Sequence, residues 1–160
     1  MNNNMNNNYS SSGNGKNNAH GKKFEIWIEE LYHSLGYRVE RNVRIGDCQL
    51  DIIYCKPLLG RKRYVECKYL SEGKVGLEEV AKFYAVLQEI RANPKLGYVV
   101  TNQDFVDRAK SFACKKGMHL YDGKNLEELD MKRRSFFPRL FKRAPSLEEQ
   151  IEKIDLRKYD

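Results

Sequence analysis

The sequence predicts an α/β domain whose single mixed sheet carries helices on both faces. Three observations lead to this fold class. Helical and strand-like apolar spacing follow one another in the order αβββαβαβα, the first three strands are joined by short turns, and the later strands are separated by helices. Short turns give antiparallel neighbours, whereas helical crossovers give parallel strands with right-handed connections. The helices can then cover both faces of the sheet with their apolar sides.

The first half of this domain is predicted to be a helix followed by a three-stranded meander. Apolar residues recur at helical spacing over residues 24–35, and Gly36 follows as a helix stop. Residues 37–45 and 49–55 alternate as strands do, with a turn signal between them. The third strand spans residues 62–70.

The second half is predicted to alternate between helices and strands. An amphipathic helix covers residues 75–92, and a short buried strand follows at residues 96–101. A third helix is expected over residues 104–117. A last short strand at residues 118–123 then precedes a short helix at residues 125–130.

Composition divides the chain into three parts. Residues 1–20 are rich in Asn and Ser and lack the apolar side chains that would offset the entropy of ordering, so we expect a disordered tail there. The α/β domain is expected over residues 21–130. Residues 131–160 form a basic C-terminal extension, in which a capping-box pattern at Ser146 and Glu149 indicates a short helix.

The charge and hydropathy of the chain restrict its partners and location. The chain has 160 residues and a net charge of +7, which favours an anionic partner such as nucleic acid. No apolar run approaches the roughly 18 residues that a membrane span needs. Without an apolar signal-peptide core, an intracellular and cytoplasmic protein is expected, while a nuclear or organelle location stays open. The oligomeric state is also open, a homodimer included.

The four cysteines do not form a recognisable metal motif. None stands in a CxxC pair or has a His at zinc-finger spacing, and three of them, Cys48, Cys55 and Cys67, fall in strand-like segments. We therefore interpret them as small apolar residues rather than as zinc ligands.

Charged residues interrupt the apolar pattern of the second and third strands. Strand alternation places Asp51 on one face and its neighbours Leu50 and Ile52 on the other. If the turn is centred at residues 58–59, Asp51 lies directly across from Glu66, with Cβ atoms about 5 Å apart. Two like charges at that separation are destabilising unless a proton or a cation intervenes.

A divalent metal would resolve this repulsion, because Mg²⁺ takes oxygen ligands and one or two carboxylates. Lys68 shares a strand face with Glu66, so it could neutralise the acids, orient a phosphate or position a water. Each role suits phosphodiester hydrolysis. The alternative is a solvated hairpin face on which Glu66 and Lys68 form an ordinary ion pair.

The order and spacing of these motifs resemble those of the PD-(D/E)xK nuclease superfamily, and most closely its Mrr-like restriction endonuclease branch. Phe24–Glu25 stands where that branch has an F-E pair on its opening helix. GDCQLD at residues 46–51 is similar to its G-D-x-x-hydrophobic-D motif, and ECK at residues 66–68 is similar to its E/Q-x-K. Residues 97–129 look like its closing strand–helix–strand unit. The resemblance covers about residues 21–129.

The resemblance implies a restriction-endonuclease-like fold and a metal-dependent DNA endonuclease that uses Mg²⁺, or alternatively Mn²⁺. Asp51 and Glu66 would bind the metal, together with the backbone carbonyl of Cys67. Lys68 would assist the attacking water, and Glu25 would be an outer ligand or would hold the water. The alternative for Glu25 is an exposed helix charge that pairs with a nearby lysine.

The chain departs from this branch at Cys48 and Gln49, where many members have two glycines. Two rival functions stay open, because fold alone does not set the substrate. One is a non-catalytic nucleic-acid-binding module on the same fold, and the other is an RNA-processing or junction-resolving nuclease. The intact set Asp51, Glu66 and Lys68 favours catalysis.

Further cations are predicted to contact nucleic acid. Lys82 is a candidate because related nucleases often place a polar residue of this helix near the phosphate. The basic extension adds a cluster without an acid, made of Lys132, Arg133, Arg134, Arg139, Lys142 and Arg143. A membrane-surface helix is the rival interpretation of this extension, but Pro138 interrupts any long amphipathic helix.

Overall fold

The computed structural model describes residues 12–58, 60–135 and 145–159. The elements are α1 (Ser12–Ser34), β1 (Arg38–Ile45), β2 (Cys48–Cys55), β3 (Arg63–Lys68), β4 (Lys74–Val75), α2 (Leu77–Glu89), η1 (Pro94–Leu96), β5 (Gly97–Thr101), β6 (Asp104–Phe105), α3 (Asp107–Lys116), β7 (His119–Tyr121), α4 (Gly123–Ser135), α5 (Leu147–Glu152) and η2 (Leu156–Lys158).

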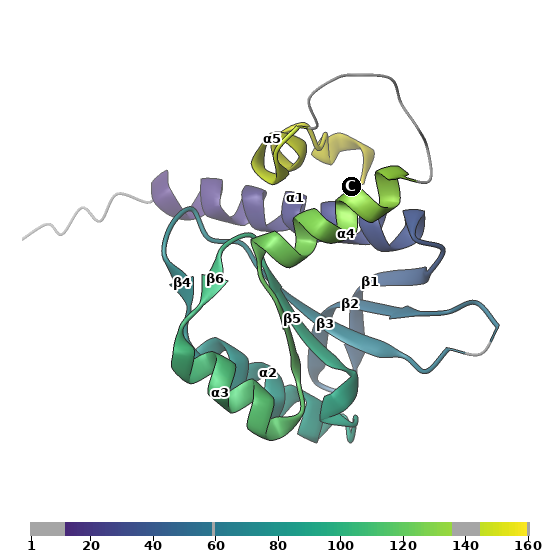
Figure 1. Cartoon of the computed structure of the whole chain (residues 1–160), viewed down its shortest axis with the longest axis vertical. Coiled ribbons are helices and arrows are strands. Elements are labelled where there is room, and N and C mark those ends of the chain that lie inside the picture. Colours follow the sequence, from purple (N-terminus) through teal and green to yellow (C-terminus); the bar gives the residue numbers. More distant parts are fainter. Residues whose placement is uncertain (1–11, 59, 136–144, 160) are drawn as a thin grey trace, which may run out of the picture.

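A five-stranded mixed sheet in the order β1-β2-β3-β5-β7 lies between two helical layers (Figure 1). The antiparallel meander β1-β2-β3 and the parallel pairs β3–β5 and β5–β7 confirm the predicted topology. The β2–β3 register pairs Ile52 with Val65 and Ile53 with Tyr64, so opposed residue numbers sum to 117, as the predicted turn requires.

Each face of the sheet has its own apolar core. On one face, α1 and α4 pack side chains such as Phe24 and Leu126 against the sheet, and Ile151 of α5 joins the same cluster. On the other face, α2 and α3 contribute residues such as Phe83 and Ala109. The two-layer covering follows from the amphipathic spacing of the helices, as predicted.

Both ends of the described chain differ from the predicted boundaries. Helix α1 begins at Ser12, so residues 12–20 are helical where a disordered tail was expected, while residues 1–11 lie outside the described residues. Tertiary contacts explain the longer helix, because His20 stacks on Tyr69 with ring centroids 5.4 Å apart. Adding residues to an existing helix also costs little once it is nucleated.

The C-terminal extension contributes to the core. Helix α5 has the predicted capping box at Ser146 and Glu149 and packs against α1. Its residues Leu147 and Ile151 are 2% and 0% exposed. The charged composition of the segment concealed this role, because two buried apolar residues one helical turn apart are enough to dock so short a helix.

A small two-stranded sheet was not predicted. Strands β4 and β6 pair in parallel, so α2 and α3 each begin later than expected. Asp104 accepts hydrogen bonds from Lys74 and Lys110, both at 2.8 Å, and thereby ties β4, β6 and α3 together. Strands of two residues carry no periodic signal that sequence analysis could detect.

Candidate active site

Three acidic side chains and a lysine gather from helix α1 and the neighbouring strands of the sheet. Glu25 comes from α1, Asp51 from β2, and Glu66 and Lys68 from β3. Continuing the β2–β3 register places Asp51 opposite Glu66, as predicted. The backbone N–H of Cys67 donates to Asp51 Oδ2 at 2.7 Å and fixes that carboxylate across the two strands.

The strand pair that carries Asp51 is distorted at that residue. The β1–β2 pairs run from Arg41↔Ile52 directly to Val43↔Leu50, so Asn42 and Asp51 occupy the unpaired position between them. Asn42 has φ 54°, a left-handed conformation that Asn adopts more readily than most residues.

The distortion changes the face of the sheet on which the side chains of β2 lie. Ile52 and Tyr54 belong to the α1 side of the core, whereas Leu50 belongs to the α2 side with Ile53. The prediction that Leu50 and Ile52 share a face is therefore wrong, because the ladder twists between them. Asp51 lies between Leu50 and Ile52, where the apolar side chains of β2 change from one core to the other. In the sequence, this distortion is marked by a single feature, the asparagine Asn42 inside an alternating strand.

Burial dominates the electrostatics of the acids. It raises the pKa of Asp51, although the hydrogen bond from Cys67 N–H and the charge of Lys68 oppose the rise. It also raises the pKa of Glu66, and the charge of Asp51 adds to this. Burial and then Asp51 raise the pKa of Glu25 to about 7. These shifts mark a cluster of negative charge that lacks full compensation.

Lys68 is held between two carboxylates. Its Nζ lies 2.9 Å from Glu66 Oε1 and 2.9 Å from Glu79 Oε2 of α2. Burial alone would lower the pKa of Lys68, but the two carboxylates outweigh it and raise the pKa. The hydrogen bond from Lys68 lowers the pKa of Glu79 in return. Sequence analysis missed Glu79, since one of two adjacent glutamates on an exposed helix turn gives no distinguishing signal.

Lys82 and Cys67 lie at the border of this cluster. Lys82 is exposed and pairs with Glu78 at 2.9 Å and with Glu79 at 3.6 Å, so it reaches the cluster only through Glu79. The Cys67 side chain packs on the α1 side of the core, and burial followed by the charge of Asp51 raises its pKa well above the usual value.

Part of the basic extension is engaged within the protein. Arg133 and Arg134 both pair with Asp130, which is only 5% exposed, and Gln150 of α5 also binds this carboxylate. Lys132 lies on the same helix, α4. Their predicted contact with nucleic acid stays a prediction, and Arg139, Lys142 and Arg143 lie outside the described residues.

The acids fit a divalent cation as a pair. Among residues 12–58, 60–135 and 145–159, no three His, Cys, Asp or Glu side chains come together as a metal-binding group. Mg²⁺ usually takes only one or two carboxylates and completes its shell with water and phosphate oxygens. Asp51 and Glu66, half-buried and opposed on adjacent strands, match that smaller requirement.

Comparison with known proteins identifies the family of this chain. The family model described as a restriction endonuclease, of the Mrr catalytic type, matches residues 17–129. The mixed sheet with helices on both faces, together with this match, thus defines a restriction-endonuclease-like protein. Since the match covers more than half of the chain, the chain belongs to this restriction endonuclease family. No curated protein sequence matches it.

Several solved structures are similar to the chain. A protein of unknown function, AF1548, is 20% identical with a TM-score of 0.60, over 78% of this chain and 73% of its own. EndoMS in a dsDNA complex and a repair endonuclease from Pyrococcus abyssi are each 16% identical with a TM-score of 0.51, over 63% of this chain. The matched part is 43% and 45% of those two chains, less than half of their length. These similarities show a shared fold.

None of the described helices is long and apolar enough to cross a bilayer.

Proposed function

We propose that this protein is a metal-dependent endonuclease that hydrolyses phosphodiester bonds in DNA. The observation that carries the proposal is the half-buried pair Asp51 and Glu66 on opposed strands, with Lys68 directly beside Glu66. Membership of the restriction endonuclease family supports the reaction class.

Each side chain of the cluster has a role in this proposal. Asp51 and Glu66 hold the metal, Mg²⁺ or alternatively Mn²⁺, together with the backbone carbonyl of Cys67. When bound, the metal polarises the phosphate and makes hydroxide available near neutral pH. Lys68 orients the attacking water. Glu25 of α1 holds that water or an outer ligand.

Glu79 acts on Lys68 rather than on the substrate. Its carboxylate shares the Lys68 ammonium with Glu66 at equal distances of 2.9 Å. Lys68 is therefore anchored from α2 as well as from its own strand, and Glu79 would still hold it if Glu66 bound a metal. We assign Glu79 as a positioning residue on this ground.

DNA is the proposed substrate because the chain carries a net charge of +7, which suits a polyanion. The name of one similar structure, EndoMS with dsDNA, supports the same class. A non-catalytic binding module is the rival, and the intact set Asp51, Glu66 and Lys68 favours the enzyme over it.

A nicking assay tests this proposal. Supercoiled plasmid is incubated with the protein in Mg²⁺, in Mn²⁺ and in chelator, with branched DNA and single-stranded RNA as parallel substrates. We expect nicked and linear DNA only in the metal arms. Cleavage of RNA alone would move the proposal to an RNA nuclease, and cleavage of no substrate in any metal would overturn it.

A further inference from the structure

The hairpin that carries the acids is strongly polarised along its length. Asp51 and Glu66 lie directly beyond the paired residues 52–54 of β2 and 63–65 of β3, and no acidic residue occurs between them in the sequence. The intervening segment instead contains four cations, Lys56, Arg61, Lys62 and Arg63. Figure 1 shows the connection between β2 and β3 extending beyond the helical layers.

A close backbone approach holds the end of this hairpin together. A Cβ on Gly60 would lie 2.2 Å from the backbone nitrogen of Lys56, so only glycine fits there. The approach brings Lys56 alongside Arg61 and Lys62. On the other side of β2, Arg38 of β1 pairs in register with Cys55 and adds a further exposed cation at the same end of the sheet.

These cations are not neutralised within the described chain. Arg63 stacks over the Tyr54 ring, with its guanidinium carbon 5.6 Å from the ring centroid, and so anchors the base of the hairpin to the core. Arg38, Lys56, Arg61 and Lys62 are exposed and form no ion pair with a described carboxylate. Arg133 and Arg134 of α4, in contrast, are both paired with Asp130.

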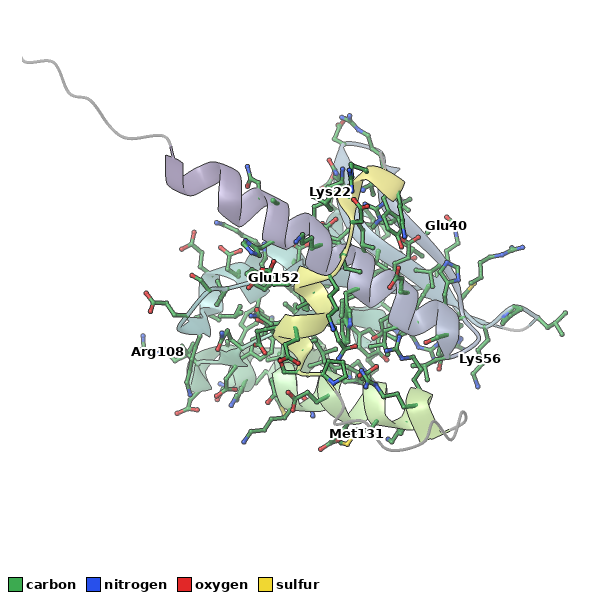
Figure 2. The ribbon with its side chains drawn as sticks, turned by 90° about the horizontal axis from the view of Figure 1, so that it is seen from above. Lys22, Glu40, Lys56, Arg108, Met131 and Glu152 are labelled. Carbon is green, nitrogen blue, oxygen red and sulfur yellow. The ribbon has the colours of Figure 1, made fainter. Side chains whose placement is uncertain are left out.

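Like charges gathered at one end of a sheet repel one another unless an anion meets them. The geometry points to a surface for the phosphate backbone of duplex DNA, formed by Arg38, Lys56, Arg61 and Lys62, which we term the basic arm. This inference rests on the proposed function. Figure 2 shows Lys56 projecting from the hairpin on the opposite side of the molecule from Arg108.

The reach of the basic arm suits a duplex held at the acids. Lys56 follows Asp51 by five residues, which at about 3.3 Å per residue is roughly 17 Å along the strand. One turn of duplex DNA is about 34 Å, so the arm would meet phosphates about half a turn from the bond at the acids. Leu58, which is 93% exposed beyond Lys56, would then contact the sugar edge of the groove.

The test measures binding of the full chain to a 30-bp duplex in chelator over a range of salt concentrations. The triple variant Lys56→Ala, Arg61→Ala, Lys62→Ala should bind more weakly than wild type. The slope of log affinity against log salt should become shallower by about 0.9 for each lost contact. Leu58→Ser should weaken binding and leave the slope unchanged, because it removes no charge.

A matched control removes the same charge elsewhere. Lys115, Lys124 and Lys153 are exposed on α3, on α4 and at the end of α5, and their triple alanine variant should keep the wild-type slope. An unchanged slope in the basic-arm variant, an equal change in the control, or no duplex binding by wild type would overturn the inference.

Cleavage distinguishes this inference from the proposed function. In Mg²⁺, the basic-arm variant should show a higher KM for plasmid and an unchanged kcat, because the arm does not touch the reacting atoms. Binding in chelator needs no hydrolysis. A protein that binds the duplex with the predicted slopes but cuts no substrate would therefore support the basic arm and contradict the proposed endonuclease. A lower kcat with unchanged KM would assign these cations to the reaction and overturn the arm.

Discussion

At the scale of single residues, the candidate site brings like charges together and leaves them partly uncompensated. Asp51 and Glu66 oppose each other across the β2–β3 ladder, and burial raises the pKa of both. A folded chain usually avoids such a pair, because each buried charge loses hydration. Strain at Asn42, directly across from Asp51, is a second local cost. Two such costs at one place are typical of a functional site.

The link between Lys68 and Glu79 can be tested by one substitution. Glu79→Gln removes one of the two carboxylates that hold the Lys68 ammonium, so the lysine should lose its fixed position. We expect plasmid cleavage about tenfold to a hundredfold slower, since small misplacements are costly in catalysis. Glu78→Gln is the control, because Glu78 pairs with Lys82 and not with Lys68. Equal cleavage rates in Glu79→Gln and Glu78→Gln would show that Glu79 does not position Lys68.

A second residue-scale prediction concerns acid stability. Hydrogen bonds from Lys110, Lys74 and the Phe105 backbone lower the pKa of Asp104 below its ordinary value of 3.8. Because the folded pKa is the lower one, Asp104 stabilises the fold above pH of about 4 and loses this effect as the pH falls through the folded pKa.

Thermal melts of Asp104→Asn and wild type check this prediction. The wild type should melt higher by a constant amount from pH 7 to pH 5, and the difference should shrink below pH of about 4. Asp47→Asn serves as control, since Asp47 is exposed in the β1–β2 turn and forms no ion pair among the described residues. A difference that grows as the pH falls would have the wrong sign.

The sequence predicted these residues unevenly. Asp51, Glu66 and Lys68 stood out because charges broke an apolar strand pattern, and the turn position then fixed the register that pairs them. Glu79 and Asn42 could not be found in this way. Their roles depend on which helix turn faces Lys68 and on a local kink, and neither leaves a periodic trace.

At the scale of elements, long periodic segments were predictable and short ones were not. Helix α2 and strand β5 carry enough apolar residues for their period to be clear. Helix α5 was expected from its capping box, but nothing in six residues indicates which surface they cover. Its docking on α1 follows from the buried residues Leu147 and Ile151, which lie one helical turn apart.

The docking of α5 gives an element-scale prediction. Ile151 is 0% exposed in the core shared with α1, so Ile151→Ala should destabilise the protein by about 2–5 kcal/mol through lost burial and the cavity left behind. Chemical denaturation of both proteins measures the change. Glu148→Ala, on the exposed side of the same helix, should change stability by less than about 1 kcal/mol. A small effect of Ile151→Ala would mean that α5 docks only loosely.

At the scale of the whole molecule, connection lengths determined the topology. A two-residue turn at Gly46 and Asp47, with Gly46 at φ 59°, makes β1 and β2 antiparallel neighbours. Helical crossovers make β3, β5 and β7 parallel. This order places the end of the β2–β3 hairpin that carries the acids between α1 and α2, which supply Glu25 and Glu79. The opposite end of the same hairpin is left to the cations of the basic arm.

The most direct test of the endonuclease is Asp51→Asn, studied by thermal melts with and without Mg²⁺ beside a plasmid-nicking assay. In chelator the variant should melt at or above the wild-type temperature, because asparagine can still accept from Cys67 N–H and removes the repulsion with Glu66. It should lose most of the stabilisation that Mg²⁺ gives wild type, and nicking should stop. Lys68→Ala should keep the Mg²⁺ response and cut poorly, while Glu40→Gln, an exposed acid on β1, should behave as wild type. Nicking by Asp51→Asn at the wild-type rate would contradict the proposed site.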